Sequence, residues 1–290
     1  MLGAFLEGVR RVSRAPVVLL SVSAAVCLLV LPHRLSLFGA LPDTWYLRTV
    51  LDRALWEWHG GWMLAGYHGA IPPAPGLASA ALAATLLWLF LSGGVLDRFA
   101  RARPIRTSAF FAASGEFFVR FLRLSLVTAP VYWWLFAWLF PRLTSTTWGQ
   151  LGFVAALGFV NLVTDYARVR AVVEDRRSMI GAIGASLRFI RRRPLRVAGL
   201  YLLGMLPSAV AIRLWFGMST WPEATAGSLA AALVVYVVLR TWARLTWMAG
   251  EVVFFQRELA HATYTGRPLP EWPESPAAEA IANLGTKSLR

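Results

Sequence analysis

The sequence contains very little cysteine, lysine or charge of any kind. Its single cysteine, Cys27, lies inside an apolar run, which excludes a disulfide framework and a cysteine-based metal site. Among 29 basic residues only Lys287 is a lysine, and charged residues make up 15% of the 290 residues, against roughly 25% in soluble domains. A hydrophobic fraction of 57% and a mean hydropathy of +0.55 point instead to a membrane protein.

The net charge of +14 would by itself suggest a nucleic-acid partner. The arginines, however, are clustered between long apolar runs, so we expect no nucleic acid and assign the charge to the surface of a membrane.

Motifs for catalysis and for nucleotide binding are also missing. The sequence has no G-x-G-x-x-G, Walker loop, G-x-S-x-G or H-E-x-x-H. His59 and His68 are nine residues apart without acid or cysteine partners at ligand spacing, so no metal is predicted. We therefore expect no catalytic residues, no cofactor and no enzyme activity.

Long apolar runs are what the sequence does have. A helix needs roughly 17 to 25 apolar residues to cross a bilayer. Six segments meet this requirement or come close to it, at about 16–31, 77–96, 124–140, 149–166, 197–215 and 229–248. The predicted fold is thus an all-α bundle of six transmembrane helices. The first segment also follows Arg10, Arg11 and Arg14 as a signal peptide would, but no cleavage pattern follows it, which favours a retained anchor.

Arginine counts orient these segments. Residues 1–15, 97–123 and 165–196 carry eighteen arginines, whereas the alternate connections carry four. Because basic residues collect in cytoplasmic loops, both termini are predicted to be cytoplasmic, in a multi-pass protein of the bacterial inner membrane.

Two stretches of the sequence resemble each other. "LDRFARAR" (96–103) closes the second span as "TDYARVR" (164–170) closes the fourth, and "RFLR" (120–123) and "RFIR" (188–191) precede the next spans, 68 residues apart. This predicts a parallel repeat of span, basic linker and span. Each linker has an amphipathic pattern, and residues 1–15 have one too. These three segments are therefore expected to form helices that lie at the membrane interface. The linker arginines expected to contact anionic lipid are Arg120, Arg123, Arg188, Arg191, Arg192 and Arg193.

The chain here resembles a broad group of bacterial six-helix membrane proteins, including YciC-like proteins and the membrane domain of some glycerophosphodiester phosphodiesterases. The residues that carry the resemblance are Asp165, Ala167, Arg168, Arg177, Ser178, Ala182, Arg188, Phe189, Arg191 and Pro194. It implies the fold over residues 1 to about 260, and no phosphodiesterase domain is present. Most of that group has no assigned activity.

The rest of the chain is one membrane domain over 1–260 and a polar, proline-rich tail over 261–290, which reads as a mostly disordered cytoplasmic segment. Residues 32–76 form the only long extracytoplasmic connection. Its tryptophans favour an interfacial helix, and a lid or partner site is the alternative.

A stripe of polar residues marks the last span. Tyr236, Arg240, Arg244, Trp247 and Glu251 are spaced for one helix face. Arg240 falls eleven residues after Leu229, about 17 Å into the span. A charge at that depth is costly unless it is paired, so it marks a functional candidate. The alternatives are a structural ion pair or snorkelling, and a cavity for a lipid headgroup or substrate.

The candidate intramembrane polar site comprises Arg240, Arg244, Glu251, Asp165, Asp97 and Asn161, with Asp165 the expected partner of Arg240. For function we expect a non-enzymatic transporter-like subunit or an anionic-lipid-handling component. The alternative is a scaffold or assembly factor that binds a cytoplasmic protein through the basic linkers. Membrane lipids are the expected partners, and any ATPase would be a separate polypeptide.

Overall fold

The protein is helical throughout its described parts. The computed structural model describes residues 1–38, 77–102, 105–143, 146–219 and 226–258, and no strand occurs within these ranges. The helices are α1 (Leu2–Ser13), α2 (Pro16–Phe38), α5 (Leu77–Arg101), α6 (Thr107–Trp134), the π-helix η3 (Leu135–Leu139), α7 (Phe140–Leu143), α8 (Thr147–Val173), α9 (Met179–Arg192), α10 (Pro194–Ser219) and α11 (Ala226–Glu258). The all-α prediction is confirmed.

Several of these helices can cross a membrane. Five segments are long and apolar enough, and the bent pair α1–α2 makes a sixth if it counts as one span. The five lie in α5, in α6 with η3 and α7, in α8, in α10 and in α11. The chain is therefore a multi-pass membrane protein by length and composition. The predicted connection 32–76 and tail 261–290 fall almost entirely outside the described residues.

The helices are longer than the apolar runs that predict them. The fourth span was expected over 149–166, but α8 begins behind the Thr146 cap, whose hydroxyl accepts from the Gly149 amide (3.1 Å), and it runs on to Val173. Asp165 therefore lies within a helix rather than at the edge of a loop. The chain then leaves α8 through Asp175, which has a positive φ of 47°, a conformation that aspartate tolerates better than most residues.

The two amphipathic linkers fold differently. The second forms a separate helix, α9, which starts at the Ser178 cap and ends where Pro194 opens α10. The first was also expected to form a separate interfacial helix before the next span. Instead, α6 continues without a break from Thr107 to Trp134. No proline follows "RFLR" (120–123) until Pro130, so nothing stops that helix.

The N-terminal helix lies across the end of the last one. A bend of 78° separates α1 from α2, at the position where Pro16 begins a new helix. The buried face of α1 contains Ala4, Gly8 and Val12 and packs against α11. A Cβ atom on Gly8 would lie 2.8 Å from the Gly250 nitrogen and from the Thr246 carbonyl oxygen, so only glycine permits this approach.

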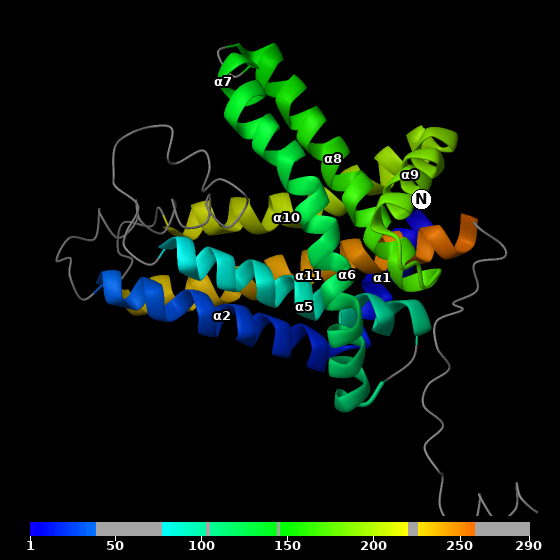
Figure 1. Ribbon diagram of the computed structural model, residues 1–290. Coiled ribbons are helices and arrows are strands. Elements are labelled where there is room, and N and C mark those ends of the chain that lie inside the picture. Colours follow the sequence, from blue (N-terminus) through cyan, green and yellow to red (C-terminus); the bar gives the residue numbers. More distant parts are fainter. Residues whose placement is uncertain (39–76, 103–104, 144–145, 220–225, 259–290) are drawn as a thin grey trace, which may run out of the picture.

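Two bodies of helices meet at one end of the molecule. In Figure 1, α2, α5, α10 and α11 run side by side, while α6, α7 and α8 form a hairpin whose tip points away from them. The hairpin joins the others through the first half of α6 and the last part of α8, where Leu162 to Val173 are almost all buried. Its far half is exposed, with Val154 56% and Trp148 84% accessible. The main core therefore sits at the junction, together with α1 and α9.

Candidate functional site

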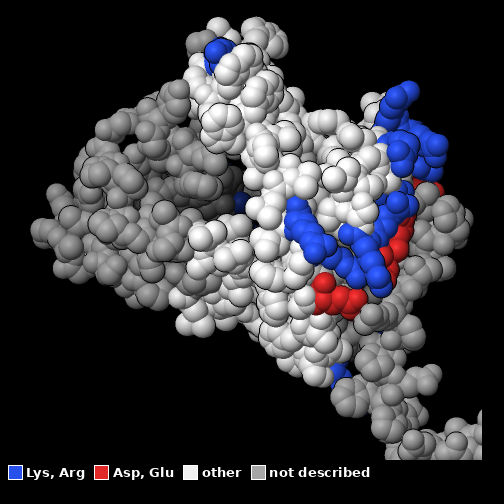
Figure 2. Space-filling view, viewed as in Figure 1, with Lys and Arg blue, Asp and Glu red and all other residues white. Residues whose placement is uncertain are grey.

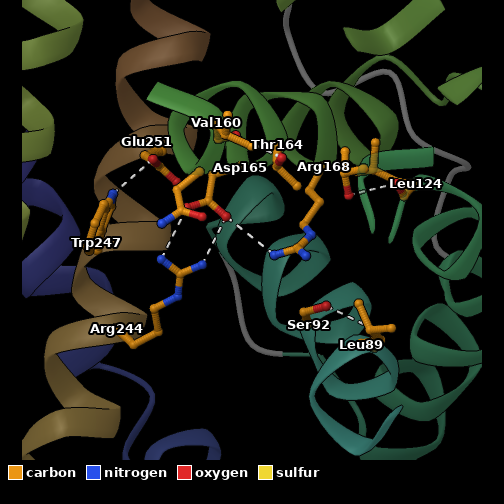
Figure 3. Close-up of polar contacts among 12 residues, drawn as sticks. Leu89, Ser92, Leu124, Val160, Thr164, Asp165, Arg168, Arg244, Trp247 and Glu251 are labelled. Atoms are coloured by element: carbon orange, nitrogen blue, oxygen red, sulfur yellow. Dashed lines mark hydrogen bonds and ion pairs between the residues drawn. The ribbon is translucent and has the colours of Figure 1, made fainter. Parts of the chain in front are cut away.

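The junction contains a buried ion pair between α8 and α11. Asp165, which is 7% exposed, accepts from both terminal nitrogens of Arg244, at 2.9 Å (Nη2 to Oδ1) and 3.1 Å (Nη1 to Oδ2). Arg168, one turn along α8, donates to Oδ1 at 3.3 Å. Figure 3 shows both guanidinium groups turned toward the Asp165 carboxylate. A bidentate arginine–carboxylate contact of this kind fixes the register of α8 against α11.

The partner of Asp165 differs from the expected one. The sequence suggested Arg240, but the residue in contact is Arg244, one helical turn closer to the end of α11. Because α8 extends beyond its apolar run, Asp165 faces a later turn of α11 than the span boundaries implied.

Glu251 and two aromatic side chains continue the cluster. Glu251 is 2% exposed and accepts from the indole nitrogen of Trp247 at 2.9 Å. Trp247 packs edge-on against Tyr201 of α10, with ring centroids 4.4 Å apart, and the Arg244 guanidinium lies 5.1 Å from its ring. Within the described residues Glu251 has no ion pair, unlike Asp165. Its burial is offset by the indole N–H and by the positive charges of Arg244 and Arg168 nearby.

Asn161 also belongs to this region, through a residue that the sequence did not single out. The Tyr132 hydroxyl of α6 donates to the Asn161 amide oxygen, and Tyr201 lies beside the same amide. A tyrosine within an apolar span is the only signal for such a contact, because a buried hydroxyl needs a partner. A Cβ atom added to Gly158, about one turn away, would lie 3.6 Å from Cε1 of the Tyr201 ring, so α8 and α10 are close here.

Asp97, in contrast, stays apart from the α8–α11 pair. It binds Arg101 of its own helix at 2.9 Å. The carbonyl groups at the end of α5 are met by other helices: the Arg11 guanidinium donates to Phe99, and the Gln256 amide donates to Ala100 at 3.0 Å. These two side chains satisfy carbonyls that a helix end leaves unpaired. The repeat therefore places Asp97 and Asp165 at matching positions, and Asp165 receives Arg244 from another helix.

Arg240 has a different environment. It is half-buried on the same face of α11 as Arg244, and its guanidinium is hydrogen-bonded to the Tyr236 phenol. No carboxylate among the described residues pairs with it. The cluster thus brings together Asp165, Arg244, Glu251 and Asn161, with Arg240 one turn beyond and Asp97 outside.

Basic residues gather at the junction end of the molecule. Figure 2 shows them around α9 and the first half of α6, while most of the remaining described surface on this face is uncharged. Carboxylates neutralise part of this charge. Arg120 contacts Asp175 and Glu116, and Arg193 contacts Glu258 at 2.6 Å. Two of the six predicted lipid-contacting arginines are therefore committed to ion pairs.

The other four predicted arginines remain exposed. Arg123, Arg188, Arg191 and Arg192 have no ion pair within the described ranges. The acids of this part of the chain are already used, since each one except Glu251 pairs with an arginine. Those pairs involve Glu7, Asp97, Glu116, Asp165, Glu174, Asp175 and Glu258. The surplus positive charge has no carboxylate left to receive it.

No group of three or more potential metal ligands occurs in the described segments. Comparison with family models, with curated proteins and with solved structures gives no match to this chain.

Proposed function

We propose that this chain is a non-enzymatic membrane protein that binds anionic phospholipid at the cytoplasmic face of the bacterial inner membrane. The observation that carries the proposal is the surplus of exposed arginines at the junction end, where the neighbouring acids are already paired. Lipid phosphates are the anions available at such a surface, and each arginine near it contributes about 1 kcal/mol.

The neighbours of these arginines support a lipid surface rather than water. On α9, Arg188, Arg191 and Arg192 share the exposed side of the helix with Ile180, which is 72% accessible. Leu195, at the start of α10, is 83% accessible. An exposed face of arginines and large aliphatic residues is typical of a helix lying at the headgroup boundary.

A buried arginine at the same end also supports an anionic ligand. Arg98 is 8% exposed and has no ion pair among the described residues, and its electrostatic neighbour is another arginine, Arg11. Arg11 pairs with Glu7 at 3.4 Å, so these two arginines share one carboxylate, and the remaining positive charge favours an anionic ligand beside them.

The test compares two arginines at the junction end with one at the hairpin tip. In nanodiscs of mixed phosphatidylglycerol and phosphatidylcholine, the double variant Arg191→Gln/Arg192→Gln should lose about 2 kcal/mol of preference for the anionic lipid, roughly 30-fold in affinity. Arg142→Gln, at the hairpin tip where Arg142 packs on Trp138 (3.9 Å), is the matched control and should change little. Headgroup enrichment measured by mass spectrometry is the readout.

Unchanged enrichment in the double variant contradicts lipid binding. That outcome favours the alternative, in which the same arginines dock a cytoplasmic protein and the chain acts as a scaffold or assembly factor.

A transporter-like role has its own supporting observation. The Asp165–Arg244 pair joins the α6–α8 hairpin, whose far half is exposed, to the helices α10 and α11. A substrate path between these two bodies would open only when this pair separates. If this is so, substitution of Asp165 and Arg244 should change the rate of substrate uptake, which can be measured once a substrate is known.

A further inference from the structure

Two arginines project from one face of α11, and only one of them is neutralised. Arg244 uses both terminal nitrogens on Asp165. Arg240, one turn away, has the Tyr236 phenol as its hydrogen-bond partner, and its charged neighbour is Arg244, which has the same sign. Across the whole cluster, the carboxylates of Asp165 and Glu251 face the guanidinium groups of Arg168, Arg240 and Arg244. One positive charge is therefore left uncompensated by the described residues.

That charge lies well inside the predicted span 229–248. Arg240 is 11 residues from Leu229 and 8 from Met248, which at 1.5 Å per residue is about 17 and 12 Å. Neither distance is within the reach of an arginine side chain, so snorkelling along α11 does not bring the guanidinium to water. An isolated charge at this depth is unfavourable, and a bound counter-ion relieves that cost.

The α6–α8 hairpin meets α11 at the level of the ion pair. Arg244 points toward Asp165 of α8 (Figure 3), and Tyr132 of α6 contacts Asn161 one turn earlier on α8. From there the hairpin diverges, as Figure 1 shows, and Val154 on its outer half is 56% exposed. Behind Arg240, Tyr236 is fixed against Trp215 with ring centroids 5.6 Å apart, which holds the phenol that orients the guanidinium.

We infer that Arg240 binds a phosphate group. A guanidinium offers parallel N–H donors that match two phosphate oxygens, and Arg244 adds a second positive charge one turn away. The inference rests on the proposed lipid handling for the source of the phosphate, which is the headgroup of an anionic phospholipid. A free phosphate has the same chemistry and is distinguished by experiment.

The experiment uses the full chain purified in mild detergent. Wild type, Arg240→Gln and Arg240→Lys are compared for phosphatidylglycerol retained in native mass spectrometry. Thermal shifts are then measured with added phosphatidylglycerol, phosphatidylcholine or inorganic phosphate. Arg213→Gln, an exposed arginine on α10, is the matched control.

We expect Arg240→Gln to lose retained phosphatidylglycerol by about thirtyfold or more, as when one partner of a desolvated charge contact is truncated. Arg240→Lys should keep part of the retention, because it preserves the charge but not the paired donors. Protection by inorganic phosphate alone, lost in Arg240→Gln, supports the site but assigns it to a soluble anion.

Equal phosphatidylglycerol retention and equal thermal shifts in wild type and Arg240→Gln overturn the inference. If Arg240→Gln does not fold, Tyr236→Phe replaces it. The phenyl ring keeps the contact with Trp215 but no longer orients the guanidinium, so retention should fall, and unchanged retention again overturns the inference.

The experiments distinguish the surface arginines of the proposed function from the inner site at Arg240. Loss of bilayer enrichment in Arg191→Gln/Arg192→Gln with full retention in Arg240→Gln leaves the proposed function standing and removes the inner site. Loss of retention in Arg240→Gln with unchanged bilayer enrichment in the double variant does the opposite.

Discussion

At the scale of single residues, the junction depends on which arginine meets Asp165. The polar stripe of α11 and the aspartate that ends the fourth apolar run could both be read from the sequence. Their pairing could not, because it depends on how far α8 continues past its apolar run and on the relative register of two helices. Arg244 and Arg240 differ by one turn, about 6 Å, which is smaller than the uncertainty of a span boundary.

The ion pair gives a first residue-scale prediction. Arg244→Leu leaves the buried Asp165 carboxylate with Arg168 as its remaining partner and should destabilise the fold by about 3 kcal/mol, the low end of the cost of breaking a buried ion pair. Asp165→Asn, added to that variant, removes the poorly compensated charge and should recover part of the loss. Thermal unfolding in detergent measures both.

Arg240→Leu is the matched control for this pair. It removes an arginine from the same helix face but strands no carboxylate among the described residues, so Asp165→Asn should not rescue it. Equal losses in Arg244→Leu with and without Asp165→Asn would show that the pair contributes no coupling.

At the scale of helices, the two amphipathic helices α1 and α9 bury different kinds of residue. In α1 the large apolar residues Leu2 and Leu6 are 60% and 56% exposed, and the small residues Ala4 and Gly8 face the protein instead. In α9 the large apolar residues Met179, Phe189 and Ile190 are buried, and Leu187 is exposed. Small residues allow close helix approach, and large aliphatic residues are equally stable against lipid, so the usual rule for soluble helices does not select the packing face.

The contact between α1 and α11 gives the element-scale prediction. Gly8→Ala places a Cβ atom 2.8 Å from two backbone atoms of α11, and this overpacking should cost about 1–3 kcal/mol and displace α1. Gly115→Ala is the matched control, since no atom lies within 4 Å of its Cβ position in α6. That variant should gain up to about 1 kcal/mol from helix propensity.

Thermal unfolding and proteolysis of the N-terminal segment distinguish these two alanine variants. If both change stability by the same amount and in the same direction, the close approach of α1 to α11 does not contribute to the fold.

At the scale of the whole molecule, the all-α fold and five apolar spans could be predicted from the sequence, because apolar runs and arginine clusters alternate along the chain. The divergence of the α6–α8 hairpin could not, because it depends on glycine-mediated contacts far apart in sequence. At Gly94, for example, a Cβ atom would meet Ser114 at 2.5 Å, so α5 and the first half of α6 touch while the later half of α6 leaves. Such contacts are set by three-dimensional packing and carry no periodic signal.

The last prediction concerns orientation in the membrane. Eighteen arginines in the connections at one side against four at the other predict that α9 and the start of α6 lie in the cytoplasm and the hairpin tip outside. In a Cys27→Ser background, single cysteines at Ser108, at Arg177 and at Thr147 occupy exposed positions in these regions. A membrane-impermeant thiol reagent applied to intact cells should modify only the Thr147→Cys variant, and permeabilised cells should show modification of all three. Modification of Ser108→Cys or Arg177→Cys in intact cells would reverse the orientation. The arginines would then face the outer side of the membrane, and their proposed contact with cytoplasmic-leaflet lipid would be wrong.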